Sequence, residues 1–289
     1  MKRVLSLLLA LALLTGLAAC GTKSDSAADA SAQPSTQASS GSSAQPVELT
    51  VFAAASMTET LNQIAELYKK AAPDVTLTFN FDSSGTLKTQ IQEGAECDVF
   101  VSAGQKQMDQ LDIAADASVN TEKLDFVVED SRINLLENRV ALCVPKGNPA
   151  GINSFDDLAK KLPEGKVLLA MGNSDVPVGQ YASKILKHYG LDENALAGSG
   201  TITYGSNVKE VTTQITEGSV GCGIVYCTDA YSAGLTPVAY ATSDMCGQVI
   251  YPAAVMKKAA HPKEAQAFLD YLRTKEAMAV FEKVGFSAV

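Results

Sequence analysis

Hydrophobic and polar positions along the chain change repeatedly between two periods. Residues 47–54, VELTVFAA, form an apolar run typical of a strand, and residues 56–72 then place Leu61 and Ile64 at helical spacing. The same succession recurs up to a helix predicted over residues 262–284. Strands that alternate with helices of this length predict an α/β fold, with parallel sheets covered by helices on both faces.

The other predicted elements follow the same alternation. The further strands are predicted at residues 74–81, 97–103, 138–147, 166–172, 201–205, 220–226 and 248–257. The intervening helices are predicted at residues 83–94, 105–114, 154–162, 177–190, 206–218 and 227–234. Two segments, residues 125–147 and 235–255, contain extended stretches with no helix between them. They fit either edge hairpins or two crossings between separate α/β lobes, and the pattern leaves both open.

The N-terminal segment has the features of a targeting sequence. Lys2 and Arg3 precede an apolar run over residues 4–14, which is short for a membrane span, and small residues precede Cys20. The ending LAAC followed by Gly21 resembles the lipobox of bacterial lipoproteins, which implies cleavage of residues 1–19 and lipid attachment to Cys20. An ordinary secretory signal with an incidental cysteine is the alternative.

Residues 20–46 consist almost entirely of small and polar amino acids. Such a segment buries too little apolar surface to offset the entropy of ordering it, so we predict a disordered tether. With the lipobox, the tether predicts a folded body anchored on the outer face of a cell membrane.

The composition argues against several classes of function. The chain has 289 residues, 46% of them hydrophobic, and a formal net charge of −9. This is enough for one large or two ordinary domains, and the negative charge disfavours a nucleic-acid partner. Five cysteines besides Cys20 form no tight spacing pattern, so a disulfide framework is not expected, although one pair stays possible. Cys143 and Cys222 lie in strand-like runs and are predicted to be buried.

Residues that could carry catalysis are few. His188 lies at the predicted end of a helix and His261 before the start of the last one, positions that structural roles explain. The chain contains no G-x-S-x-G, phosphate-loop, C-x-x-C or H-E-x-x-H motif. We therefore expect neither an enzyme nor a cofactor nor a bare metal ion.

Five places share one design, in which a strand ends, small or capping residues follow, and a helix begins. Their sequences are AAASMTE, DSSGTLK, SDVPVGQY, GSNVKEV and IVYCTDA. The start of a helix leaves backbone N–H groups unpaired and carries partial positive charge, so each place is a candidate anion site. Ligands of open α/β sheets bind at the carboxyl ends of the strands, where all five places lie.

The same five places predict specific helix caps. We expect Ser56 and Glu59 to form a capping box and Pro177 to take the first position of its helix. The remaining cap candidates are Ser83, Ser84, Ser206 and Asn207. Any one of these serines is most simply an ordinary cap.

From about Glu48 to Val289 the sequence resembles the molybdate-binding proteins of bacterial ABC importers. The segments that carry the resemblance are TVFAAASMTETL, FDSSGTLKTQIQEGAECDVFVSAGQKQMDQL, DVPVGQYA, GIVYCTDA and FLDYLRTKEAMAVFEKVGF. The resemblance implies a two-lobed periplasmic-binding-protein fold of type II, with two crossing strands and the ligand in the cleft between the lobes. It implies a first lobe of residues 47–137 and 238–289, and a second of residues 138–237.

The resemblance also implies the ligand-binding residues. Ser56 and Ser84 resemble hydroxyl donors of the first lobe, Val178 and Val208 backbone N–H donors of the second, and Tyr226 a phenol donor. Val178 replaces an alanine that the family often has, which keeps the donor but adds bulk. The implied function is capture of molybdate, and of tungstate, by a monomeric lipoprotein that delivers it to a membrane permease.

Other ligands and another class of protein stay open. Ferric-ion binders of this fold use paired tyrosines and a carboxylate, for which Tyr226, Tyr231 and Asp229 are candidates, but a helical spacing points the two phenols apart. Sulfate is a further candidate ligand, and a surface adhesin that binds no ion is the alternative outside transport. Lys88 and Lys209 lie close to the predicted site in sequence and are expected to point out from their helices.

Overall fold

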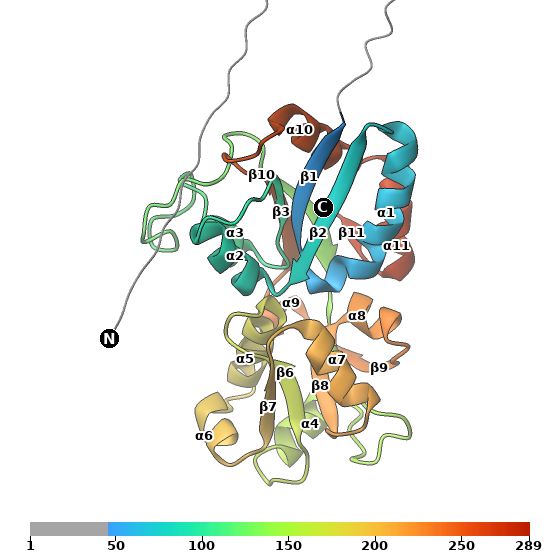
Figure 1. Cartoon of the computed structure of the whole chain (residues 1–289). Helices are drawn as coiled ribbons and strands as arrows, with labels where there is room; N and C mark the ends of the chain where they lie inside the picture. Colours follow the sequence, from blue (N-terminus) through green and yellow to red (C-terminus); the bar gives the residue numbers. More distant parts are fainter. Residues whose placement is uncertain (1–45) are drawn as a thin grey trace, which may run out of the picture. The chain divides into compact units, whose positions relative to one another are not determined.

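A computed structural model describes residues 46–289 of the chain (Figure 1). The predicted signal peptide, most of the tether and the lipidated Cys20 lie outside the described residues. Within the described part, no helix is both long enough and apolar enough to cross a lipid bilayer.

The first of two sheets has six strands in the order β11-β4-β10-β3-β1-β2. Its strands are β1 (Val47–Ala54), β2 (Val75–Asp82), β3 (Val99–Val101), β4 (Ile133–Asn138), β10 (Val249–Val255) and β11 (Ser287–Ala288). Strand β1 runs parallel to β2 and β3, whereas β10 runs antiparallel to β3 and β4. The helices of this part of the chain are α1 (Thr58–Ala71), α2 (Ser84–Gln92), α3 (Gln105–Asp109), α10 (Pro262–Tyr271) and α11 (Lys275–Val284).

The second sheet has five strands in the order β7-β6-β8-β5-β9. Its strands are β5 (Val140–Cys143), β6 (Leu169–Gly172), β7 (Ile202–Gly205), β8 (Cys222–Tyr226) and β9 (Pro237–Tyr240). Strand β6 runs parallel to β7 and β8, and β5 runs antiparallel to β8 and β9. The remaining helices are α4 (Phe155–Lys161), α5 (Pro177–His188), α6 (Glu193–Gly198), α7 (Val208–Thr216), α8 (Cys227–Ser232) and α9 (Ser243–Cys246).

The chain passes between the two sheets twice. It leaves the first sheet at the end of β4, and β5 of the second sheet begins after a single intervening residue, Arg139. It returns between β9 and β10. The two segments are therefore crossings between two α/β lobes, each containing one sheet. The prediction that the second segment has no helix is wrong, since α9 lies between β9 and β10. We propose these two crossings as the hinge between the lobes.

The predicted C-terminal helix over residues 262–284 is wrong in one respect, since two helices cover this range. Helix α10 ends at Tyr271, and α11 begins at Lys275. The Thr274 hydroxyl accepts a hydrogen bond from the backbone N–H of Ala277 at 3.3 Å and caps the second helix. Leu272 and Phe281 are both fully buried, so the hydrophobic pattern continues across the break and hides it.

All five described cysteines are buried and free. Cys143 and Cys222 have no exposed surface, which confirms their predicted place in the core. Burial raises the pKa of both thiols to about 12, so they stay protonated at neutral pH.

Candidate functional site

A small cavity lies where the two lobes meet, at the carboxyl ends of strands from both sheets. Its volume is about 10 Å³, room for about one water-sized sphere. Its lining residues are Ala54, Ala55, Ser56, Asp82, Ser83, Ser84, Ala103, Val176, Pro177, Val208 and Tyr226. The first seven belong to the first lobe and the last four to the second, so the two lobes close this cavity together.

Ser56 lies in a short 3-10 turn, η1 (Ala55–Met57), between β1 and α1, and is 4% exposed. The predicted capping box is wrong, because α1 begins only at Thr58 and no side chain caps it. The turn places the Ser56 hydroxyl 2.9 Å from the hydroxyl of Tyr251 on β10. Glu59 points elsewhere, toward Lys209. The Ser56 side chain thus does not cap α1, and it lines the cavity.

The hydrogen bonds behind Ser56 favour one direction for its hydrogen bond with Tyr251. The Asn138 side-chain oxygen accepts from the backbone N–H of Arg139 at 2.8 Å, so the amide NH₂ faces the other way. That NH₂ donates to the Tyr251 hydroxyl at 3.1 Å and to the Thr228 hydroxyl at 3.0 Å. Tyr251 keeps its own proton and can give it to Ser56 Oγ, although either hydroxyl can be the donor of this bond. When Tyr251 is the donor, the Ser56 proton is free to point into the cavity, which Ser56 lines.

Ser84, the first residue of α2, also lies at the cavity without capping its helix. Its neighbour Ser83 caps α2, accepting from the backbone N–H of Thr86 at 3.1 Å. Ser84 has no exposed surface and accepts a hydrogen bond from the backbone N–H of Ala103 at 2.9 Å. Its proton is therefore also free to donate into the cavity.

The second lobe contributes backbone groups. The Asn207 side chain caps α7 by accepting from the N–H groups of Lys209 and Glu210, which leaves that of Val208, the first residue of the helix. Pro177 is the first residue of α5, as predicted. Val178 follows it and is fully buried, but it is not among the residues that line the cavity.

Tyr226 is the last residue of β8 and is 1% exposed. Its hydroxyl donates to the backbone carbonyl of Ala103 across the two lobes, at 3.1 Å. Burial raises the pKa of this phenol well above its usual value, so it remains a proton donor at neutral pH. The structure thus brings Ser56, Ser84, Val208 and Tyr226 to one cavity.

Three residues of the site were not predicted from the sequence. Ala103, which contacts both Ser84 and Tyr226, ends a predicted strand and could have been found by that position. Tyr251 and Asn138 are 195 and 113 residues from their hydrogen-bond partners, Ser56 and Tyr251, and nothing local marks them.

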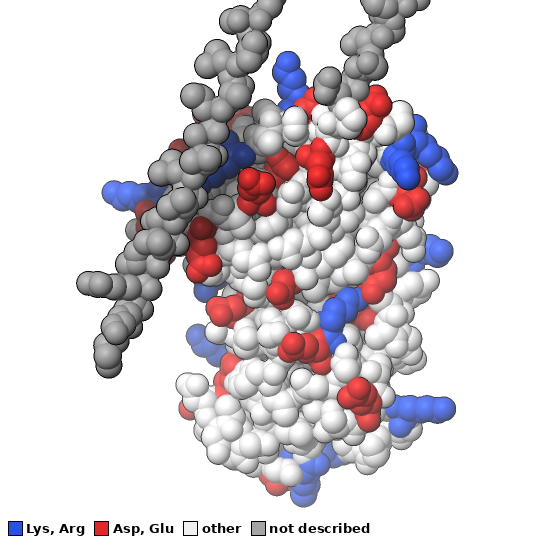
Figure 2. All heavy atoms as spheres, in the orientation of Figure 1, with Lys and Arg blue, Asp and Glu red and all other residues white. Residues whose placement is uncertain are grey.

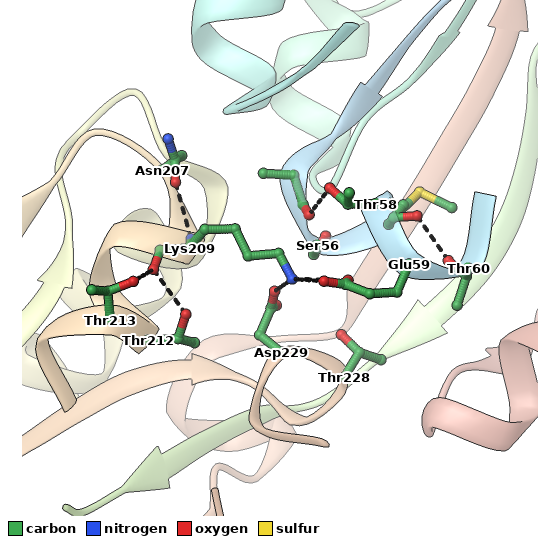
Figure 3. Close-up of polar contacts among 12 residues, drawn as sticks. Ser56, Thr58, Glu59, Thr60, Asn207, Lys209, Thr212, Thr213, Thr228 and Asp229 are labelled. Carbon is green, nitrogen blue, oxygen red and sulfur yellow. Dashed lines mark hydrogen bonds and ion pairs between the residues drawn. The ribbon is translucent and has the colours of Figure 1, made fainter. Parts of the chain in front are cut away.

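A cluster of charged residues lies beside the site (Figure 3). Lys209 Nζ is 2.8 Å from both carboxylate oxygens of Glu59 and 3.7 Å from Asp229 Oδ1. Lys209 points out from α7 and does not line the cavity, but it reaches across to α1 rather than into open solvent. Asp229 is fully buried, and neither of its carboxylate oxygens has a hydrogen-bond partner. Burial raises its pKa to about 7, with nearby Lys209 acting in the opposite direction.

The rival metal site is not assembled. Tyr231 is 55% exposed whereas Tyr226 is buried, so the two phenols do not converge. Across residues 46–289, no three His, Cys, Asp or Glu side chains are grouped so as to hold a metal ion. His188 is the last residue of α5, and His261 precedes α10 without a side-chain capping bond.

Charged side chains do not gather into a large basic area on the face shown in Figure 2. Acidic and basic residues are interspersed there among uncharged surface. A nucleic-acid reader would present a basic patch or stripe, so this face gives no support to such a partner.

Comparison with known proteins places the chain in a family. Residues 49–287 match the model of a family described as bacterial extracellular solute-binding protein. A Bacillus subtilis protein, described as an ABC transporter substrate-binding lipoprotein, is 35% identical over 255 residues, 88% of this chain and 92% of that protein. The molybdate-binding protein ModA of Haemophilus influenzae is 33% identical over 255 residues, 85% of this chain and 92% of that protein.

A solved structure is also similar. It is the substrate-binding domain assigned to a molybdenum ABC transporter of Clostridium difficile, with a TM-score of 0.60, 31% identity, and coverage of 84% of this chain and 99% of that one. The predicted type II binding-protein fold is thereby confirmed. More distant relatives include a sulfate-binding protein of Synechococcus elongatus and an aconitate isomerase of Pseudomonas, 27% and 25% identical. The chain belongs to the bacterial extracellular solute-binding protein family.

Proposed function

We propose that the chain captures molybdate or tungstate in the cleft between its lobes and delivers it to an ABC importer. The observation that carries this proposal is the convergence of uncharged donors from both lobes on one cavity. Ser56 and Ser84 come from the first lobe, and Val208 and Tyr226 from the second. The molybdate-binding protein of Haemophilus influenzae supports the choice of ligand. Val178 stays a proposed fifth donor, one that a small rotation of α5 would have to bring to the ligand.

Uncharged donors suit a fully deprotonated tetrahedral dianion. Every oxygen of such an ion accepts hydrogen bonds, and the free protons of Ser56 and Ser84 supply them. Asp82 is the charged residue that lines the cavity, and one of its carboxylate oxygens accepts from the backbone N–H of Ser83 at 2.7 Å. A protonated ligand such as hydrogen phosphate would leave its own proton unpaired, at a cost of about 1–3 kcal/mol.

Size should separate molybdate from sulfate. Sulfate is also deprotonated, but its bonds are shorter, so donors fixed on two lobes cannot all reach it at good hydrogen-bond length. We therefore expect molybdate and tungstate to bind about equally, sulfate far more weakly, and phosphate more weakly still. The site is buried, so the affinity should depend only mildly on salt.

Entry of the ligand requires the lobes to move. A cavity of about 10 Å³ is too small for a tetrahedral oxyanion, and the Tyr226 hydroxyl is bound to Ala103 across it. We propose that the lobes part at the two crossings, admit the ion, and close with Tyr226 donating to the ligand in place of Ala103. Hinge motions of this kind are absorbed by a few residues at the ends of elements.

The proposed location is the outer face of the cell membrane. The lipobox-like ending at Cys20 and the polar segment over residues 20–46 support a lipid anchor with a tether. The Bacillus subtilis relative is described as a lipoprotein, in line with this proposal. The proposed partners are the oxyanion and a membrane permease, and we propose that the protein is a monomer without a cofactor.

Sulfate is the second candidate, because a sulfate-binding protein is among the relatives. Isothermal titration of the purified protein with molybdate, tungstate, sulfate and ferric citrate separates the candidates, and we expect heat from the first two at micromolar ligand or below. Sulfate binding as tight as molybdate would replace the proposed ligand, ferric binding would indicate an iron carrier, and no binding at all would favour a surface protein outside transport.

A further inference from the structure

Three charged residues each lie close in sequence to a proposed donor. Glu59 follows Ser56 by three positions, and Asp229 follows Tyr226 by three. Lys209 directly follows Val208. The three elements that present these donors, η1–α1, α7 and β8–α8, therefore each contribute one member of the charged cluster.

The cluster joins the two lobes. Glu59 belongs to α1 of the first lobe, whereas Lys209 and Asp229 belong to α7 and α8 of the second (Figure 3). Lys209 Nζ contacts both Glu59 oxygens at 2.8 Å and Asp229 Oδ1 at 3.7 Å. Its ammonium group thus lies between a carboxylate of one lobe and a carboxylate of the other.

The two carboxylates differ in their dependence on Lys209. Glu59 is 45% exposed and can turn to water when the lobes part. Asp229 has no exposed surface and no hydrogen bond to either carboxylate oxygen, so Lys209 is the cation within reach of its buried charge. Asp229 therefore keeps the lysine at the lobe boundary, and Glu59 engages it only when the lobes lie together.

We propose that Lys209 is a positioning residue of the oxyanion site, holding Ser56, Val208 and Tyr226 at the spacing that the ligand needs by clasping Glu59 across the cleft. This inference rests on the proposed function. None of the three charged residues lines the cavity, so the clasp acts without touching the ligand. Because the pair forms only between closed lobes, its loss should appear mainly as faster release of the ligand.

The test is a double-mutant cycle on molybdate affinity and release with Glu59→Gln, Lys209→Gln and both together. We expect Glu59→Gln to weaken molybdate binding about 1.5- to fivefold, which is the range for a partly exposed ion pair. Most of this weakening should appear as a faster rate of ligand release. Lys209→Gln should weaken it at least as much, and adding Glu59→Gln to it should change nothing further.

The matched control is Asp125→Asn. Asp125 pairs with Lys257 at 2.6 Å, with side chains 46% and 41% exposed, and both residues belong to the first lobe. Removing this pair should leave release unchanged. Wild-type release in the Glu59 and Lys209 variants, additive effects in the cycle, or a lower melting temperature without faster release would each overturn the clasp.

Scattering distinguishes failure of the clasp from failure of the proposed function. If the wild type binds neither molybdate nor tungstate, the proposed function fails. Small-angle scattering of the free protein then tests whether the pair of Lys209 with Glu59 holds the lobes together. A larger radius of gyration for Glu59→Gln than for the wild type would sustain the clasp, and identical profiles would overturn it.

Discussion

Tyr251→Phe tests how the site directs its serine proton. The substitution removes one hydroxyl from a fully buried ring and leaves the ring in place. That hydroxyl lies 2.9 Å from Ser56 Oγ and accepts from Asn138 at 3.1 Å. Without it, Ser56 no longer receives a hydrogen bond, and its proton is free to turn away from the ligand.

The expected magnitude follows from one neutral hydrogen bond. Such a bond contributes about 0.5–1.5 kcal/mol, so molybdate should bind about two- to tenfold more weakly. Ser56→Ala removes a donor to the charged ligand itself, worth about 1.5–3 kcal/mol, so the loss should be about ten- to a hundredfold. In the Ser56→Ala background, Tyr251→Phe should add almost nothing, since it acts through that hydroxyl.

Calorimetry on the wild type, both single variants and the double variant measures these values. Tyr181→Phe is the matched control, because its hydroxyl donates to the backbone carbonyl of Gln248 at 3.3 Å and to none of the proposed donors. Unchanged or tighter molybdate binding by Tyr251→Phe would show that Tyr251 does not direct the Ser56 proton toward the ligand. It would mean that Ser56 donates to Tyr251 and presents only lone pairs to the ligand.

Three further substitutions follow from the geometry. Ser84→Ala should weaken molybdate binding about ten- to a hundredfold in calorimetry, and it should also lower the melting temperature, because the buried backbone N–H of Ala103 loses its acceptor. Gly85→Ala would place a Cβ 2.2 Å from the Asp175 carbonyl oxygen, so it should block closure, and scattering should show a larger radius of gyration with molybdate than the wild type has. The pKa of Asp229 is about 7 in the folded protein and about 3.9 in the unfolded chain, so the folded protein binds one more proton between these two pH values. The free energy of unfolding should therefore fall by up to about 4 kcal/mol as the pH rises from about 3.9 to about 7. Urea unfolding should show that this fall in the free energy of unfolding is absent from Asp229→Asn. Parallel profiles of unfolding free energy against pH for the two proteins would contradict the prediction.

The sequence predicted the architecture because the signals for it are local. Apolar runs and helical spacing marked most elements, and small or capping residues at strand ends marked the places where the cavity forms. Ala54 and Ala55 line the cavity beside Ser56, in keeping with the space that small side chains leave. What the pattern missed were short elements such as α6 and the break before Thr274, where the hydrophobic spacing continues unchanged.

The contacts that direct the site could not be predicted from local patterns. Ser56 and Glu59 have the spacing of a capping box, but a 3-10 turn and two distant partners, Tyr251 and Lys209, take both side chains elsewhere. A contact such as that of Lys209 with Glu59 joins residues 150 positions apart. Whether a charged side chain points to solvent or across a cleft depends on the packing of two lobes, which no single segment encodes.

We propose above that uncharged donors of the two lobes hold a molybdate ion between them. The most direct measurement is the anomalous scattering of molybdenum in crystals of the protein grown with molybdate. We expect one strong peak in the cleft, with oxygens within hydrogen-bond distance of Ser56 Oγ, Ser84 Oγ, the Val208 N–H and Tyr226 Oη. A peak elsewhere, such as in the surface hollow of about 510 Å³ beside Lys146, or a cleft without molybdenum at saturating ligand, would contradict it.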